Sequence, residues 1–99
     1  MINKRKIETI KEKLSETMAQ FMFEPYDVKT FYDAKRAVTK TLGYQRRSGA
    51  IYDYLVVCDR SNNPQALPNR VGAKQFLKVD VAIQFTPKSK FIYIPIKVG

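Results

Sequence analysis

Leu77 to Phe85 reads LKVDVAIQF, and apolar and polar side chains alternate along this stretch with a period of two. Successive side chains of a β-strand point to opposite faces, so one face of this segment is apolar and the other is mostly polar. The apolar face comprises Leu77, Val79, Val81, Ile83 and Phe85, and the opposite face comprises Lys78, Asp80, Ala82 and Gln84. Because an apolar strand face must be covered, the rest of the chain has to supply a layer against it.

Two other segments have the composition of strands. Ile51 to Asp59 (IYDYLVVCD) is rich in β-branched and aromatic residues. Phe91 to Val98 follows the short connection TPKSK and places Ile92, Ile94, Ile96 and Val98 on one face. Because Pro95 has no backbone N–H, this last strand is predicted at a sheet edge or in an irregular ladder. Arg60 to Gly72 contains SNNPQALPN and is predicted to be a turn-rich loop.

The covering layer is predicted from the first half of the chain, where the apolar period changes to about 3.6 residues. Asn3 to Phe21 is predicted to be a helix, with Asn3 as its N-cap and a stop upstream of Pro25. Its apolar stripe comprises Ile7, Ile10, Leu14, Met18 and Phe21.

A second helix is predicted from Val28 to Arg47. Asp27 is placed to cap its start, and Gly49 is placed to end it in a left-handed conformation. Gly43 weakens the helix by about 1 kcal/mol relative to Ala, which permits a break near it. The packed side comprises Phe31, Ala34, Val38, Leu42 and, at its margin, Gln45.

The order of these elements predicts the fold class. Helix, helix, strand, strand, strand gives no alternating βαβ signal, so a doubly wound sheet is excluded. We predict an α+β domain in which two N-terminal helices pack on one face of a small, mainly antiparallel sheet of about three strands. Its 99 residues suffice for a single domain, spanning residues 1–99. No apolar run is long enough for a membrane-spanning helix.

Residues that could carry catalysis are scarce. The chain has one cysteine and no histidine, so it offers no zinc-ligand cluster and lacks the usual general base near neutral pH. Cys58 ends an apolar strand, which predicts a buried, reduced thiol without a chemical role. Glu24, Asp27 and Asp33 surround a helix start, where carboxylates serve as caps and dipole partners. We therefore expect no enzymatic activity, no cofactor and no metal.

The charge balance is the most unusual feature of the composition. Eighteen Lys and Arg residues face nine acidic residues, a net charge of +9. Such an excess favours an acidic partner, which can be a nucleic acid, an anionic membrane or an acidic protein surface; improved solubility is the alternative reason.

Part of this charge is concentrated on the second helix. At 100° per residue, four basic side chains fall within roughly 40° of one another and nearly opposite the packed side. We call these residues the basic ridge: Lys29, Arg36, Lys40 and Arg47. A solvated helix face normally mixes both signs, so a row of one sign favours a contact surface over simple solvation.

Four segments in order resemble the C-terminal domain of the contractile tail sheath proteins of phages and pyocins. They are INKRKIETIKEKL (Ile2 to Leu14), FEPYD (Phe23 to Asp27), RRSGAIYDYLVVCDRSNNP (Arg46 to Pro64) and VDVAIQFTPKSKFIYIPIKV (Val79 to Val98). They are similar to the opening helix, a Phe-Glu-Pro-Asn-Asp motif, a Gly-Ala strand that ends in Cys-Asp before an Asn-Asn turn, and the closing strand pair of that family. The residues that match these structural motifs are Phe23, Glu24, Pro25, Asp27, Gly49, Cys58, Asp59, Asn62 and Asn63.

The resemblance implies a structural function in a virion. In the family, this domain lines the tail tube, subunits form stacked hexameric rings, and arms of neighbouring subunits add strands to its sheet. The sheath then contracts to drive injection. The implied partners are other copies of the subunit, the tail tube protein and baseplate proteins, after assembly in the host cytoplasm. The basic ridge is then expected to face the tube, and the expected inter-subunit strand comprises Phe91, Ile92, Tyr93, Ile94, Ile96 and Val98.

Two alternatives stand beside this interpretation. Within the same tail, a short sheath-like initiator or terminator would carry the same motifs. From another class, a small basic nucleic-acid-binding protein would explain the charge and the six Tyr and six Phe residues. Tyr44, Tyr52, Tyr54 and Tyr93 are the aromatic residues expected to be exposed. Because no nucleic-acid-binding signature is present, direct binding to nucleic acid is not expected, and neither is binding to a membrane.

Overall fold

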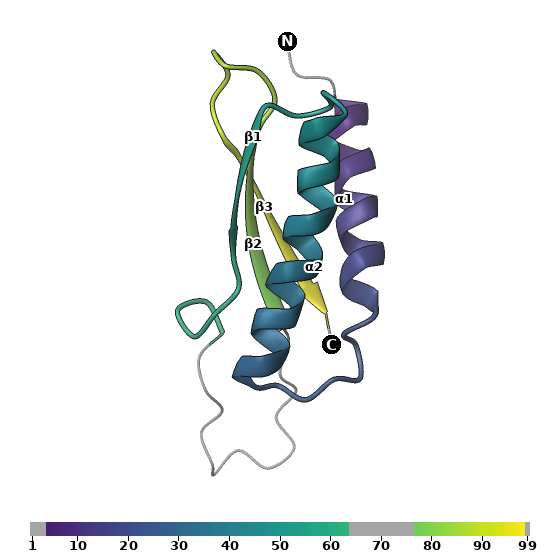
Figure 1. The fold of residues 1–99 in the computed structure, drawn as a ribbon, viewed down its shortest axis with the longest axis vertical. Coiled ribbons are helices and arrows are strands. Elements are labelled where there is room, and N and C mark those ends of the chain that lie inside the picture. The colour runs from purple at the N-terminus through teal and green to yellow at the C-terminus, as the bar shows by residue number, and fades with distance from the viewer. Residues whose placement is uncertain (1–3, 64–76, 99) are drawn as a thin grey trace.

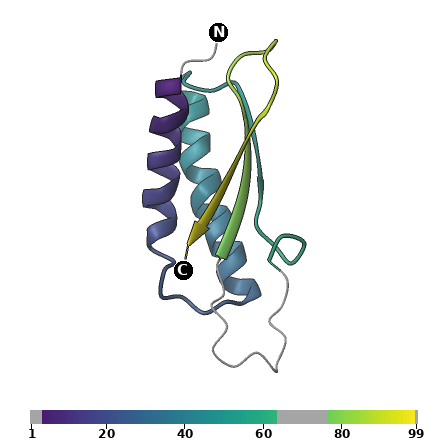
Figure 2. The same ribbon diagram turned by 180° about the vertical axis from the view of Figure 1, so that it is seen from behind.

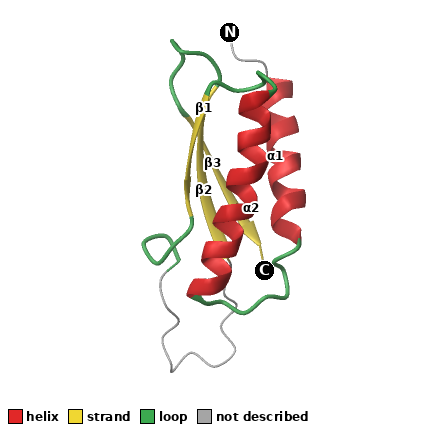
Figure 3. Cartoon of the chain, viewed as in Figure 1, coloured by secondary structure: helices red, strands yellow, loops and turns green. Residues whose placement is uncertain are grey.

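The computed structural model describes residues 4–63 and 77–98, and it confirms the α+β fold. Two helices, α1 (Lys4–Ala19) and α2 (Val28–Arg47), pack side by side on one face of a three-stranded antiparallel sheet (Figures 1 and 3). The strands are β1 (Asp53–Val57), β2 (Leu77–Gln84) and β3 (Ile92–Val98). The Asn3 cap and most of the predicted loop that ends at Gly72 lie outside the described residues.

The helix α1 has the predicted apolar stripe but ends two residues early. Ile10, Leu14 and Met18 are buried, whereas Phe21 is half-buried in the turn that follows. There the Phe21 N–H donates to the Met18 carbonyl oxygen at 3.0 Å. The Gln20 side chain donates to the Thr17 carbonyl oxygen at 2.9 Å, which satisfies a group that a longer helix would have used.

Both predicted ends of α2 are confirmed. The Asp27 side chain accepts from the Thr30 N–H at 2.9 Å. Gly49 has a φ of 83°, its N–H donates to the Arg46 carbonyl oxygen, and the next N–H, of Ala50, donates to the Gln45 carbonyl oxygen. This pair of bonds is the Schellman motif, which requires a left-handed residue at the Gly49 position.

The helix α2 is continuous through Gly43, so no break occurs where the sequence permitted one. A Cβ atom at this position would lie 3.4 Å from the Tyr54 hydroxyl oxygen. This is an ordinary van der Waals distance to the end of a side chain, so the packing of β1 against the helix leaves room for a Cβ atom here.

The sheet has the order β1-β2-β3, with Leu55 opposite Ala82 and Val81 opposite Ile94. The predicted faces of β2 are confirmed, since Leu77, Val79, Val81 and Ile83 are all buried. The first strand is shorter than the predicted Ile51 to Asp59, although Ile51 and Cys58 beyond its ends are buried. Pro95 lies in β3, which is an edge strand as predicted.

The core lies between the helix layer and the sheet (Figure 2). The helix α1 contacts β3, and α2 contacts β1 and β2, so each edge strand is covered mainly by its own helix. None of the described helices is long and apolar enough to span a membrane.

Candidate interaction surfaces

The basic ridge lies on the solvent side of α2. Its four residues, Lys29, Arg36, Lys40 and Arg47, are all exposed, whereas Phe31, Ala34, Val38 and Leu42 on the opposite side of the same helix are buried. At a rise of 1.5 Å per residue, the ridge extends over about 27 Å. The Arg36 guanidinium carbon lies 5.9 Å from the centre of the Tyr32 ring, close enough for a cation–π contact.

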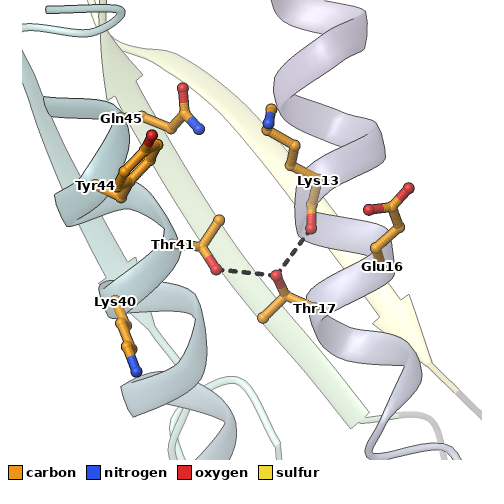
Figure 4. Close-up of a pocket in the computed structure, with 7 residues that line it drawn as sticks. All are labelled: Lys13, Glu16, Thr17, Lys40, Thr41, Tyr44 and Gln45. Carbon is orange, nitrogen blue, oxygen red and sulfur yellow. Dashed lines mark hydrogen bonds between the residues drawn. The ribbon is translucent and has the colours of Figure 1, made fainter. Parts of the chain in front are cut away.

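A groove between α1 and α2 borders the ridge (Figure 4). It has a volume of about 380 Å³ and is lined by Lys13, Glu16, Thr17, Lys40, Thr41, Tyr44 and Gln45. The Thr17 and Thr41 hydroxyl groups lie 2.9 Å apart and join the two helices across the groove. Lys13 of α1 and Lys40 of α2 both line it, so α1 adds to a basic surface that the sequence had placed on α2 alone.

Lys13 was missed because the helical pattern of one segment does not reveal which neighbouring helix lies beside it. Tyr32 was missed for a similar reason, since its exposure depends on how α2 is rotated against the sheet.

Of the tyrosines expected at the surface, Tyr44, Tyr52 and Tyr93 are exposed. Tyr54 is instead half-buried against the core, so that expectation was wrong for this residue.

The expected inter-subunit strand, β3, pairs with β2 within the described part of the chain. Ile94 and Ile96 are 1% and 7% exposed and belong to the core of this same chain. Ile92 and Val98 pack against that core while half-buried. The apolar side chains of β3 are therefore explained by the domain itself, and they cannot serve as a reason for pairing with a neighbour. What β3 offers a neighbour is its backbone edge and exposed Tyr93, with exposed Phe91 directly before the strand.

The outer face of the sheet carries a polar cluster around Asp80. Its carboxylate accepts from the Tyr93 hydroxyl and, at 3.0 Å, from the Asn62 amide, and it lies 3.6 Å from the Lys78 ammonium nitrogen. Burial raises the pKa of Asp80, but these three neighbours outweigh that effect and hold its pKa below the usual value. Asp80 thus links β2 to β3 and to the turn that follows β1. Exposed Leu55 lies on the same outer face.

The Asn-Asn turn proves to be a hydrogen-bonded clasp between β1 and β2. The buried Asn63 side chain donates to the Lys78 carbonyl oxygen and accepts from the Lys78 N–H, both at 2.7 Å. Asn62 donates to the Val57 carbonyl oxygen at 2.7 Å and accepts from the Asp59 N–H at 2.9 Å. The Asp59 carboxylate in turn accepts from the N–H of Ser61, and contacts from Ser61 lower the pKa of Asp59.

Cys58 lies beneath this clasp and is 2% exposed, as predicted. Burial and the neighbouring charge of Asp59 raise the pKa of its thiol to about 11. The thiol therefore stays protonated near neutral pH, where a nucleophile would need to be a thiolate. Among the residues that the structure describes, no cluster of three His, Cys, Asp or Glu side chains could hold a metal ion.

The Phe-Glu-Pro motif lies in the connection between α1 and α2. Phe23 is 95% exposed, and Glu24 and Pro25 are exposed as well. By contrast, Asp27 is fixed at the start of α2, where hydrogen bonds from Thr30 lower its pKa. Burying a Phe side chain is worth about 1.5–3 kcal/mol, so a partner surface that covered this ring would gain free energy of that order.

The sequence-predicted residues therefore fall on three separate surfaces. The basic ridge lies on α2, the backbone edge lies on β3 beneath α1, and Phe23 lies at the connection between the helices. The Asn-Asn and Cys-Asp motifs instead hold β1 to β2. A comparison with protein-family models, curated proteins and solved structures gives no match to this chain.

Proposed function

We propose that this chain is a structural subunit of a contractile tail sheath, which binds an acidic tail tube through the basic ridge. The observation that carries the proposal is the row of four exposed basic residues along one side of α2, opposite the packed core. The ordered sheath-like segments of the sequence supply the tube as the partner. A short initiator or terminator of the same sheath would use the same surface.

The physics of the ridge suits a sheath that must hold a tube and later release it. An exposed ion pair contributes about 0–1 kcal/mol, so one subunit binds weakly, whereas many subunits repeat the contact along the tube. Charged contacts also give fast, orientation-dependent association without a deep apolar interface.

The open edge of β3 supports the second part of the proposal, namely linkage between subunits. In the described structure, β3 pairs with β2 only, and an unpaired strand edge can accept a strand from a partner. Pro95 removes one donor from this strand, which restricts the registers that an added strand can adopt.

Charge reversal of the ridge tests the proposal. Arg36→Glu together with Lys40→Glu should reduce binding to the tail tube at least about tenfold at low salt, since attraction is replaced by repulsion. Binding is measured by co-sedimentation with purified tubes, and the fold is checked by urea unfolding. Lys88→Glu combined with Lys90→Glu, at exposed positions of the β2–β3 connection, is the matched control and should bind normally. Equal binding by the ridge variant and the control would refute the proposal.

A nucleic-acid-binding function is the second candidate, because exposed Tyr32 and Tyr44 lie on α2 together with Arg36 and Lys40. Aromatic faces interspersed with basic residues can stack bases while neutralising phosphates. Four phosphate contacts would make log K fall with log salt at a slope of about −3.6 on duplex DNA. Such a slope, with no binding to tubes, would favour this candidate.

A further inference from the structure

Phe23 has a feature that neither the basic ridge nor β3 uses. Its aromatic side chain is 95% exposed, yet the backbone that carries it is ordered by hydrogen bonds on both sides. The Glu24 N–H donates to the Phe21 carbonyl oxygen at 3.2 Å, and the Asp27 N–H donates to the Pro25 carbonyl oxygen at 3.1 Å. An aromatic side chain carried on a hydrogen-bonded backbone has only its own rotamers left to fix on binding, which suits an interface anchor.

The opposite end of the molecule has a pocket of matching chemistry. It has a volume of about 250 Å³ and combines apolar lining from Ile10, Ala50 and Phe85 with basic residues Arg5 and Lys6. A closed cavity of about 150 Å³ holds a benzene ring, so this more open pocket has enough volume for a phenylalanine ring. Its basic residues would also attract the Glu24 carboxylate, which follows Phe23 directly.

The pocket and Phe23 lie too far apart to meet within one chain. The connection that carries Phe23 is at the end of α1, whereas the pocket is formed by the start of α1, the segment after α2 and the end of β2. Figure 1 places these two regions at opposite ends of the helix pair. The molecule extends 47 Å along its longest axis. A second copy of the chain can bring the two regions together.

We propose that Phe23 of one copy inserts into the pocket of the next copy, with Glu24 beside Lys6. We call the Phe23 side chain the knob and the pocket lined by Ile10, Ala50 and Phe85 the socket. Each copy presents the knob at one end and the socket at the other, so the contact is head-to-tail. Such a contact builds rings or filaments rather than closed two-fold dimers. This inference rests on the proposed assembly function, for which it names a direct contact between subunits.

Two variants separate knob from socket. Phe23→Ala removes the knob and leaves the socket intact, and it costs no core contact because Phe23 is exposed. Thr9→Trp fills the socket from an exposed position on α1 and leaves the knob intact. Each variant alone should self-associate at least about tenfold more weakly than the unaltered chain in sedimentation velocity. Mixed together, they retain one working contact and should form a heterodimer that does not grow further.

The mixture is observed by NMR, in which isotope-labelled Phe23→Ala chain is titrated with unlabelled Thr9→Trp chain. At about 1 mM of the second chain, a contact with a millimolar dissociation constant has a measurable bound fraction. The expected result is a set of amide shifts confined to the socket, around Lys6, Ala50 and Phe85. The spectra of the separate variants also test whether each one is folded. Leu55→Thr, which alters another exposed apolar side chain on the outer face of the sheet, is the control and should associate normally.

Charge exchange provides an independent readout. Glu24→Lys and Lys6→Glu should each weaken association separately, and mixing Phe23-containing Glu24→Lys chain with Lys6→Glu chain should restore it. Absence of socket shifts in the complementation experiment, or failure of this exchange to restore association, would overturn the proposed contact. Tube binding through the ridge is measured separately. Loss of the head-to-tail contact with normal tube binding leaves the proposed function standing. Absence of tube binding with a normal head-to-tail contact refutes only the proposed function.

Discussion

At the scale of single residues, Asn63 joins two distant segments of the chain through its side chain. Its buried amide pairs with both backbone groups of Lys78, as a neighbouring strand residue would. Asn63→Ala leaves the Lys78 N–H without this acceptor, while the Lys78 carbonyl oxygen keeps a bond from the Asn62 amide at 3.2 Å. A polar group left unsatisfied costs about 1–3 kcal/mol. We therefore expect the free energy of unfolding to fall by about 1–3 kcal/mol in urea titrations. Arg60→Ala, at an exposed position of the same turn, is the control and should change it by less than about 0.5 kcal/mol. Similar losses in the two variants would show that the clasp contributes nothing specific.

At the scale of elements, the two glycines around the end of α2 should respond in opposite directions to the same substitution. Gly49 has a φ of 83°, so Gly49→Ala forces a Cβ atom into left-handed backbone at a cost of about 1–2 kcal/mol, although nothing lies within 4 Å of it. Gly43 is helical, and the added Cβ of Gly43→Ala would meet only the Tyr54 hydroxyl at 3.4 Å. Alanine there should raise the free energy of unfolding by up to about 1 kcal/mol. Thermal unfolding of both variants measures the difference, and destabilisation of equal size would contradict it.

Helices, strands and their buried faces were the features that the sequence predicted best. The alternation in β2 and the 3.6-residue stripes of α1 and α2 are local patterns, so they predicted the strands, the helices and their buried faces. Asp27 and Gly49 act through neighbouring residues and were predictable as caps for the same reason. The clasp was not, because Asn63 bonds to a residue that lies fifteen positions away, and an Asn-Asn pair alone indicates only a turn. The shared groove of Lys13 and Lys40 likewise depends on helix packing.

At the scale of the whole molecule, the open edge of β3 leads to a prediction about hydrogen exchange. Deleting β3 is a poor test of linkage, since Ile94 and Ile96 belong to the core and their loss would unfold the domain. In an isolated chain, amides of β3 that point away from β2 should exchange rapidly, whereas those that point toward β2 should be protected. On assembly, the first group should gain at least about tenfold protection, while β2 amides, already paired on both sides, change little. Unchanged exchange along β3 in assembled particles would exclude strand addition at this edge.

The long pairing between β2 and β3 has a consequence for how the domain withstands tension. Seven residue pairs run from Leu77 opposite Val98 to Ile83 opposite Ile92. A pull along the axis of β3 would slide it past β2 and strain all of these pairs at once, whereas a pull across the sheet would open them one after another. Bonds that are strained together resist a far greater load than bonds that break singly. A neighbour joined lengthwise to β3 would therefore load the domain along its strongest direction.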